Sequence, residues 1–384
     1  MASHWETEVL TTCALDYMTW DNFYSEGPAS VGPTTVRRFQ VDQPRDVETF
    51  NRLSGELVPK QAETTLAEQE RWMRAQGPLS TALLGYLESN AASYDAFIFF
   101  GYLYATTYFG LPLVKDKAYL APLAHDEWPI YFTMWDRFFN LPKGFIFQTP
   151  EERQFLARRF RSHSFPGPIA GVGIDHPPVS DPDGFREKYN LHRPFLLYVG
   201  RIDASKGCAD LFDWFVKRGD RLRHFQLVLT GSEVLPVPYD PDIIYLGFVS
   251  EEEKWNAMAA CRWLILPSEY ESLSISLLET WMVGRPAIVN AKSGVLRGHC
   301  RRSNGGVWYR NWRECEAFLG SIDDPTMSKL GAQGKRYVAE NYTWDRVEST
   351  YVSVVPGKAY PRESEGSNRG KGAAPFEARS ISPA

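Results

Sequence analysis

Two basic residues that follow an apolar run directly could bind a charged ligand. The run 194–199 ends at Gly200, and Arg201 and Lys206 follow it, five positions apart. Ligands of doubly wound α/β sheets bind beyond the carboxyl ends of the strands. Arginine offers a planar fork of donors and lysine a mobile point charge, so the two suit a diphosphate, which a glycine backbone can approach closely. A surface turn with two solvated cations explains these residues equally well when they are taken alone.

Two carboxylates lie around the start of a later helix. Glu271 and Glu279 follow the apolar run 264–266, with seven residues between them. A helix that starts near Ser274 would hold Glu279 about one and a half turns inside it and leave Glu271 in the preceding loop. The free N–H groups at such a helix start bind anions, and Glu279 could accept hydrogen bonds from ribose hydroxyls. This spacing is common by chance, but together with the upstream cations it predicts a nucleotide site.

The elements that must hold these side chains alternate between short apolar runs and helical patterns. Continuous apolar runs of this length are typical of buried parallel strands, and their alternation with helices predicts βαβ units. The expected strands are 8–12, 36–41, 94–100, 118–124, 144–147, 194–199, 225–229, 243–246, 263–266 and 286–289, and the expected helices include 62–75, 79–88, 251–261 and one that opens with a capping box at 149–152.

The sequence therefore predicts an α/β protein of two doubly wound domains, joined near the Gly- and Pro-rich stretch 165–178. A chain of 384 residues is long enough for two such domains. We expect a first domain over 1–170, a second over 171–342 and a disordered tail over 356–384, which is rich in Gly, Ser, Pro and charge.

The composition argues against several classes of protein. Hydrophobic residues make up 43% and charged residues 23%, as in a folded globular protein. The formal net charge of −5 argues against a nucleic-acid partner, because phosphate binding needs clustered positive charge. The five cysteines form no CxxC, which argues against a disulfide framework or a zinc site. No apolar run could span a bilayer and the first residues lack a signal-peptide layout, so we expect a cytoplasmic protein.

In their order and spacing, these motifs resemble the retaining glycosyltransferases of family four, which have the GT-B fold of two Rossmann-like domains facing a central cleft. The resemblance covers about residues 8–355. It also implies that a helix over 343–355 crosses back to the first domain. The segments that carry it are 171–175, 199–207, 229–232, 246–250 with the helix 251–261, 271–279, 284–286, 303–306 and 342–346.

The resemblance implies a role for each matching side chain. The two cations would hold the donor diphosphate, Glu279 the ribose, and the loop at Glu271 the transferred sugar. His125 matches a histidine that family members place near the reacting sugar, although a histidine that caps the following turn is the alternative. Catalytic roles fall on His125, Arg201, Lys206 and Glu271, and donor binding on Gly200, Arg201, Lys206, Gly247, Phe248, Ser272, Leu273, Ser274 and Glu279.

The reaction implied is transfer of a sugar from a nucleotide-diphosphate sugar to an acceptor hydroxyl, with retention of configuration through an oxocarbenium-like transition state. No metal or cofactor is expected besides this co-substrate. The acceptor could be a saccharide, a lipid or another hydroxyl compound. Two alternatives stay open: a non-catalytic nucleotide-sugar-binding subunit that needs a partner chain, and a nucleotide-sugar epimerase of the same fold.

The chain departs from the family pattern in two places. After Glu271 it has Ser-Leu-Ser where many members have a glycine-bearing turn. Family members also open with a strand and a glycine-rich loop before the segment that matches 8–12, so we expect an incomplete first domain, unpaired strand edges and low activity. Some members dock on membranes through a basic, aromatic face. A solvated helix surface is the plainer interpretation here. Such a face could nevertheless form from Arg153, Phe155, Arg158, Arg159, Phe160 and Arg161.

Overall fold

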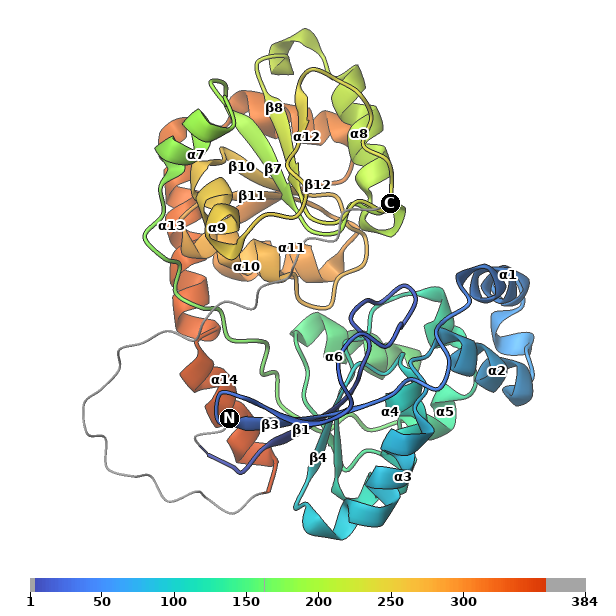
Figure 1. The fold of residues 1–384 in the computed structure, drawn as a ribbon. Helices are drawn as coiled ribbons and strands as arrows, with labels where there is room; N and C mark the ends of the chain where they lie inside the picture. Colours follow the sequence, from blue (N-terminus) through green and yellow to red (C-terminus); the bar gives the residue numbers. More distant parts are fainter. Residues whose placement is uncertain (1–3, 162, 357–384) are drawn as a thin grey trace, which may run out of the picture.

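The computed structural model describes residues 4–161 and 163–356, which fold into two α/β lobes (Figure 1). In Figure 1 the lobe built from the second half of the chain lies above the lobe that contains the N-terminus. Most of the predicted tail, from residue 357 on, lies outside the described residues.

The second lobe is built on one parallel sheet of six strands, in the order β12-β11-β10-β7-β8-β9. Its central strands β7, β8, β10 and β11 are almost wholly buried, which is why they are mostly apolar. Leu197 of β7 packs toward α9 and α10, while its neighbour Leu196 packs toward α8 and α12. The elements are α7 Pro182–Lys188, β7 Phe195–Val199, η5 Ala204–Lys206, α8 Cys208–Lys217, η6 Asp220–Leu222, β8 Gln226–Thr230, β9 Ile243–Tyr245, α9 Glu251–Ala260, β10 Trp263–Leu266, α10 Ile275–Met282, β11 Ala287–Asn290, α11 Gly294–Ser303, β12 Gly306–Tyr309, α12 Trp312–Ser321, α13 Asp324–Asn341 and α14 Trp344–Val354.

The first lobe contains two separate three-stranded sheets, β1-β3-β2 and β4-β5-β6. Strand β3 pairs in parallel with β1 and antiparallel with β2, and the other sheet is entirely parallel. The elements are β1 Glu8–Thr12, β2 Gly27–Val31, β3 Thr34–Phe39, α1 Val47–Leu57, η1 Gln61–Glu63, α2 Leu66–Gln76, α3 Thr81–Asn90, η2 Ala91–Ser93, β4 Phe97–Phe100, α4 Ala105–Gly110, η3 Leu111–Lys117, β5 Ala118–Ala121, η4 Trp128–Tyr131, α5 Trp135–Phe138, β6 Gly144–Phe145 and α6 Pro150–Arg159.

Strands β1 and β4 each have a ladder partner on only one side among the described residues. Their side chains are correspondingly less buried than those of β5, β7 and β10. Val9 of β1 is 42% exposed and Phe100 of β4 is 50% exposed, although both are large and apolar. Unpaired strand edges leave backbone N–H and C=O groups without ladder partners.

Helix α14 carries the chain back to the first lobe, as its colour at the end of the sequence makes visible in Figure 1. Its Val347 and Tyr351 are buried in one cluster with Tyr119 of β5 and Ile146, which follows β6. The two lobes are therefore connected twice, once through the segment between α6 and α7 and once through α14.

Several helices and strands begin or end at other residues than the sequence predicts. The strand expected at 36–41 is Thr34–Phe39, and the helix expected at 62–75 begins only at Leu66. It begins there because Thr65 and Glu68 form a reciprocal capping box. Of the residues expected to form a basic, aromatic face, Phe160 is only 2% exposed and packs in the core of the first lobe. Among the described residues no helix is long and apolar enough to cross a membrane.

Candidate functional site

The two predicted cations lie at the carboxyl end of β7. Lys206 closes the short helix η5, and Gly207 follows in a left-handed conformation with φ +76°. A side chain at Gly207 would collide with Pro267, because its Cβ would lie 2.6 Å from the Pro267 carbonyl oxygen. This close approach brings the loop after β7 against the end of β10. There Lys206 Nζ lies 3.0 Å from Glu271 Oε1, so two of the predicted residues form an ion pair.

Arg201 lies between the two lobes. Its Nε is 3.3 Å from the carboxylate of Asp203, and its guanidinium carbon lies 5.6 Å from the centre of the Tyr17 ring, which belongs to the first lobe. The hydroxyl of Tyr198 donates to the Arg201 carbonyl oxygen at 2.7 Å and holds the backbone behind it. A planar cation in this position can face a ligand bound between the lobes.

The Ser-Leu-Ser loop adopts a backbone that normally favours glycine. Ser274 has φ +70° and forms the N-cap of α10, and Leu273 is buried beside it. The first-lobe residue Thr149 donates through its hydroxyl to the Ser272 carbonyl oxygen at 3.3 Å. A non-glycine residue in a left-handed conformation is strained, and such strain persists where the surrounding structure imposes it. The free N–H groups at the start of α10 follow directly.

Glu279 lies inside α10, as the helix start near Ser274 predicts, and it has a partner that the sequence did not reveal. Lys254 of α9 places its Nζ 2.9 Å from Glu279 Oε1, and 2.7 Å from the carboxylate of Glu251. Burial raises the pKa of Glu279, and the hydrogen bond from Lys254 opposes that effect. The carboxylate that we expect to bind the ribose is therefore paired with a lysine of the neighbouring helix.

His125 faces the second lobe from the loop after β5. Its ring stacks on Tyr270, with the centroids 5.9 Å apart and the planes inclined by 27°. Burial, and then the charge of Lys206, lowers the pKa of His125 to about 4, so the ring is neutral at pH 7. The buried Nδ1 has no hydrogen-bond partner among the described residues. We therefore find no ring hydrogen bond that caps the following turn.

Gly247 and Phe248 lie just beyond β9, at the same edge of the sheet. The Gly247 carbonyl oxygen accepts from the Gly231 N–H and the Thr230 hydroxyl, both at 2.9 Å. The ring of Phe248 is 80% exposed, although it is large and apolar. An anchored loop that presents an exposed ring is a surface on which a flat base could stack.

Comparison with known proteins decides the fold. The structure superposes on sucrose-phosphate synthase from Thermosynechococcus elongatus with a TM-score of 0.63, at 17% identity, over 91% of this chain and 88% of that chain. It superposes on Anabaena HepE, in complex with UDP and glucose, with a TM-score of 0.60, at 13% identity, over 83% of this chain and 85% of that chain. The chain has the GT-B fold.

Sequence comparison gives a family match within the second lobe of this GT-B chain, and partial matches to known proteins. Residues 181–318 match the family model described as glycosyl transferases group 1. Alpha-D-kanosaminyltransferase of Streptomyces kanamyceticus is 33% identical over 164 residues, 38% of this chain and 42% of that protein. An uncharacterized glycosyltransferase of Methanocaldococcus jannaschii is 25% identical over 194 residues, 44% of this chain and 48% of that protein. The chain thus matches less than half the length of these relatives.

The GT-B chain also places residues that no motif predicted beside the candidate site. Glu127 follows His125 by two positions, and the buried Tyr102 donates through its hydroxyl to Glu127 Oε1 at 2.9 Å. Tyr102, Tyr17 and Lys254 belong to other segments and reach the site only through tertiary packing. The acidic residue two places after His125 was the one signal available in the sequence.

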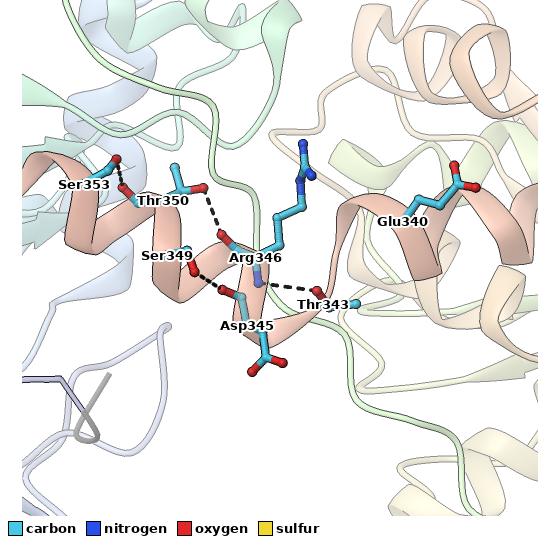
Figure 2. A pocket seen from close by; sticks show the side chains of 7 residues that line it. All are labelled: Glu340, Thr343, Asp345, Arg346, Ser349, Thr350 and Ser353. Atoms are coloured by element: carbon cyan, nitrogen blue, oxygen red, sulfur yellow. Dashed lines mark hydrogen bonds between the residues drawn. The ribbon is translucent and has the colours of Figure 1, made fainter. Parts of the chain in front are cut away.

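A surface hollow lies elsewhere in the GT-B chain. It has a volume of about 590 Å³ and borders the turn between α13 and α14 (Figure 2). Figure 2 shows that its polar side chains come from α13, α14 and the turn between them, and three hydrogen bonds of these side chains are made to backbone oxygens of α14 itself. The candidate site is therefore the group of side chains that meet where the two lobes come into contact. No group of three potential metal ligands occurs within residues 4–161 and 163–356. The hollow is lined by Glu340, Thr343, Asp345, Arg346, Ser349, Thr350 and Ser353.

Proposed function

We propose that this protein is a glycosyltransferase that moves a sugar from a nucleotide-diphosphate sugar to an acceptor hydroxyl, with retention of configuration. One observation carries the proposal: Lys206 pairs with Glu271 at the strand ends of the second lobe, and its charge acts on His125 of the first lobe. The match of residues 181–318 to glycosyl transferases group 1 supports it, as do the sugar-transferring relatives. The two other candidate functions, a binding subunit and an epimerase, gain no support from a particular contact.

The donor diphosphate would lie against Arg201 and Lys206. As the bond between the sugar and the diphosphate breaks, negative charge grows on the leaving group, and two fixed cations stabilise it. Glu271, held by Lys206, is then placed to accept hydrogen bonds from hydroxyls of the transferred sugar. The N–H groups of Ser272 to Ser274 face the same region at the start of α10.

The nucleoside would extend toward α9. Ribose hydroxyls would donate to Glu279, and the base would lie beside Gly247 and Phe248. His125 is neutral at pH 7, because its pKa is lowered to about 4, so it acts as a hydrogen-bonding group and not as a cation. The proposal includes no metal or cofactor besides the donor. We propose a cytoplasmic setting, with which the five buried free cysteines accord.

Nucleotide binding is the first test. In a thermal-shift titration with UDP, GDP, ADP and their glucose conjugates, one nucleotide should raise the melting temperature, because a ligand that binds only the folded state stabilises it. Lys206→Ala should weaken that binding about 10- to 100-fold, the equivalent of about 1.4–2.8 kcal/mol. Lys217→Ala is the matched control, since Lys217 is an exposed lysine on the neighbouring helix α8.

Turnover then separates the functions. Product analysis by NMR, with the donor so identified and a panel of sugar, lipid and aryl alcohols, should detect a glycoside with the anomeric configuration of the donor. Binding without turnover would favour the non-catalytic subunit, and conversion of the donor sugar without an acceptor would favour the epimerase. No stabilisation by any nucleotide, or equal stabilisation of the Lys206→Ala variant, would contradict the proposal.

A further inference from the structure

Glu127 is a carboxylate beside His125 that the donor-binding roles above leave unused. It lies at the start of η4, in the loop that follows β5, and its side chain is 22% exposed. The Tyr102 hydroxyl donates to its Oε1 at 2.9 Å. Tyr102 itself is 1% exposed and packs edge-on against Trp135, with ring centroids 4.8 Å apart. A rigid donor therefore orients one carboxylate oxygen of Glu127.

The second oxygen of Glu127 is available to a ligand. Oε2 accepts no hydrogen bond from the described residues and is not among their buried unpartnered atoms. His125 Nδ1 lies 3.9 Å from Oε1. The charge of Lys206 acts on both His125 and Glu127, so the carboxylate lies close to the cation that we assign to the leaving diphosphate.

We propose, on the basis of the function above, that Glu127 is the acceptor-side base of the reaction: its Oε2 binds the attacking hydroxyl and takes its proton. The acceptor oxygen attacks the anomeric carbon from the face that the diphosphate leaves, as retention in one step requires, and its O–H bond breaks as the new bond forms. The bond between the anomeric carbon and the diphosphate oxygen breaks, its electron pair leaves with the diphosphate, and the proton stays on Glu127 until solvent removes it. Tyr102 is a positioning residue, because it touches the carboxylate and not the acceptor.

The protonation of Glu127 suits this task. Burial raises the pKa of Glu127 to about 7, while the hydrogen bond from Tyr102 and the charge of Lys206 lower it. A general base works best when its pKa lies near the working pH, because it is then both ionised and basic enough to bind the proton. The other titratable groups that face it are the neutral His125 and the hydroxyl of Tyr104, on which the Glu127 charge acts.

Donor hydrolysis, with water in place of the acceptor, tests the role without knowledge of the acceptor. Release of sugar from the donor that the titration identifies should rise between pH 5.5 and 8.5, with a midpoint near 7. Glu127→Gln should lower the rate about 100- to 10,000-fold, the usual contribution of a general base, and abolish the midpoint. Tyr102→Phe should move the midpoint to higher pH, because it removes a hydrogen bond that favours the carboxylate. Asp126→Asn, in the same loop, should leave the midpoint unchanged.

Donor binding, measured by the thermal shift, shows which idea fails. If Glu127→Gln binds the nucleotide as the wild type does and also keeps the rate and its midpoint, the role of Glu127 is wrong and the proposed function stands. An unmoved midpoint in Tyr102→Phe would likewise overturn the assignment. If the wild type binds no nucleotide, the proposed function is wrong and the role of Glu127 fails with it.

Discussion

The carboxylate of Glu279 is held by a lysine, and this contact controls how the proposed ribose site responds to pH. Lys254 is 17% exposed and Glu279 13% exposed, so solvent screens the pair only in part. Burial raises the pKa of Glu279 above its usual value, and the hydrogen bond and charge of Lys254 stabilise the ionised carboxylate. Ionised Glu279 without this partner would be a partly buried, uncompensated charge.

Lys254→Met should therefore destabilise the protein in a pH-dependent way. A carboxyl group with a raised pKa in the folded state contributes stability that is present below its unfolded pKa of about 4.3 and is lost as the pH rises through the folded pKa. Since the substitution raises that pKa further, the gap in unfolding free energy between wild type and variant should widen from pH 5 to pH 8, to about 1–3 kcal/mol. Urea unfolding at both pH values measures it.

Lys188→Met is the control for this experiment. Lys188 pairs with Glu253 of the same helix α9, but its side chain is 60% exposed, so its loss should cost about 0–1 kcal/mol at either pH. A gap for Lys254→Met that is the same at pH 5 and pH 8 would contradict the role given to the Lys254–Glu279 pair.

At the scale of residues, the sequence predicts side chains that follow strands, because strand ends collect at one edge of a parallel sheet. Lys206 and Glu271 do meet at such an edge. Partners such as Lys254 and Tyr102 could not be predicted in the same way. Tyr102 and Glu127 are joined by packing across 25 positions of sequence, and no local pattern encodes that contact.

Helix α6 fixes the loop that carries His125 and Glu127. Glu152, in its first turn, is 1% exposed. One of its oxygens accepts from the Ala124 N–H at 2.8 Å and the other from the Gln148 N–H at 2.7 Å. Both oxygens thus face backbone donors, and the side chain clamps the end of β5 to the start of α6.

Glu152→Gln should weaken this clamp, because an amide has one acceptor oxygen and would turn its NH₂ toward the other donor. We expect a loss of about 1–3 kcal/mol in the free energy of unfolding, as for other buried groups left unsatisfied. Transfer should slow, since His125 and Glu127 lose their fixed position, while nucleotide affinity should stay unchanged. Glu252→Gln, an exposed first-turn glutamate of α9, should cost less than about 0.5 kcal/mol. Equal losses in the two variants would contradict the clamp.

At the scale of elements, the buried strands were predictable, and the exposed edge strand β2 was not. Strands β7, β8 and β10 are continuously apolar because helices cover both faces, and they lie within a residue or two of the predicted positions. Strand β2 was missed because it is a mostly exposed edge strand, and its sequence has few of the apolar residues that a buried strand needs. The first lobe is divided into two sheets by the pairing of strands that lie apart in the sequence. The apolar pattern within one strand does not indicate which other strand it pairs with.

The whole molecule brings the two halves of the site together through a small number of contacts between lobes. Helix α11 of the second lobe lies beside α6 of the first, where Arg302 donates through Nη1 to Glu151 Oε1 at 2.5 Å (Figure 1). The stack of His125 on Tyr270 lies across the same division. Nucleotide contacts, by contrast, are all proposed within the second lobe.

Arg302→Gln should therefore separate transfer from nucleotide binding. Loss of this partly exposed ion pair should cost less than about 1 kcal/mol in the free energy of unfolding. It should still lower kcat/KM about three- to tenfold, equivalent to about 0.7–1.4 kcal/mol in activation free energy, because the first-lobe groups meet the donor less often. The nucleotide Kd should not change. Arg301→Gln, its exposed neighbour on α11, is the control, and Glu151→Gln combined with Arg302→Gln should lose no more than either alone. If Kd rises as much as kcat/KM falls, the pair acts on the donor site itself and not on the approach of the lobes.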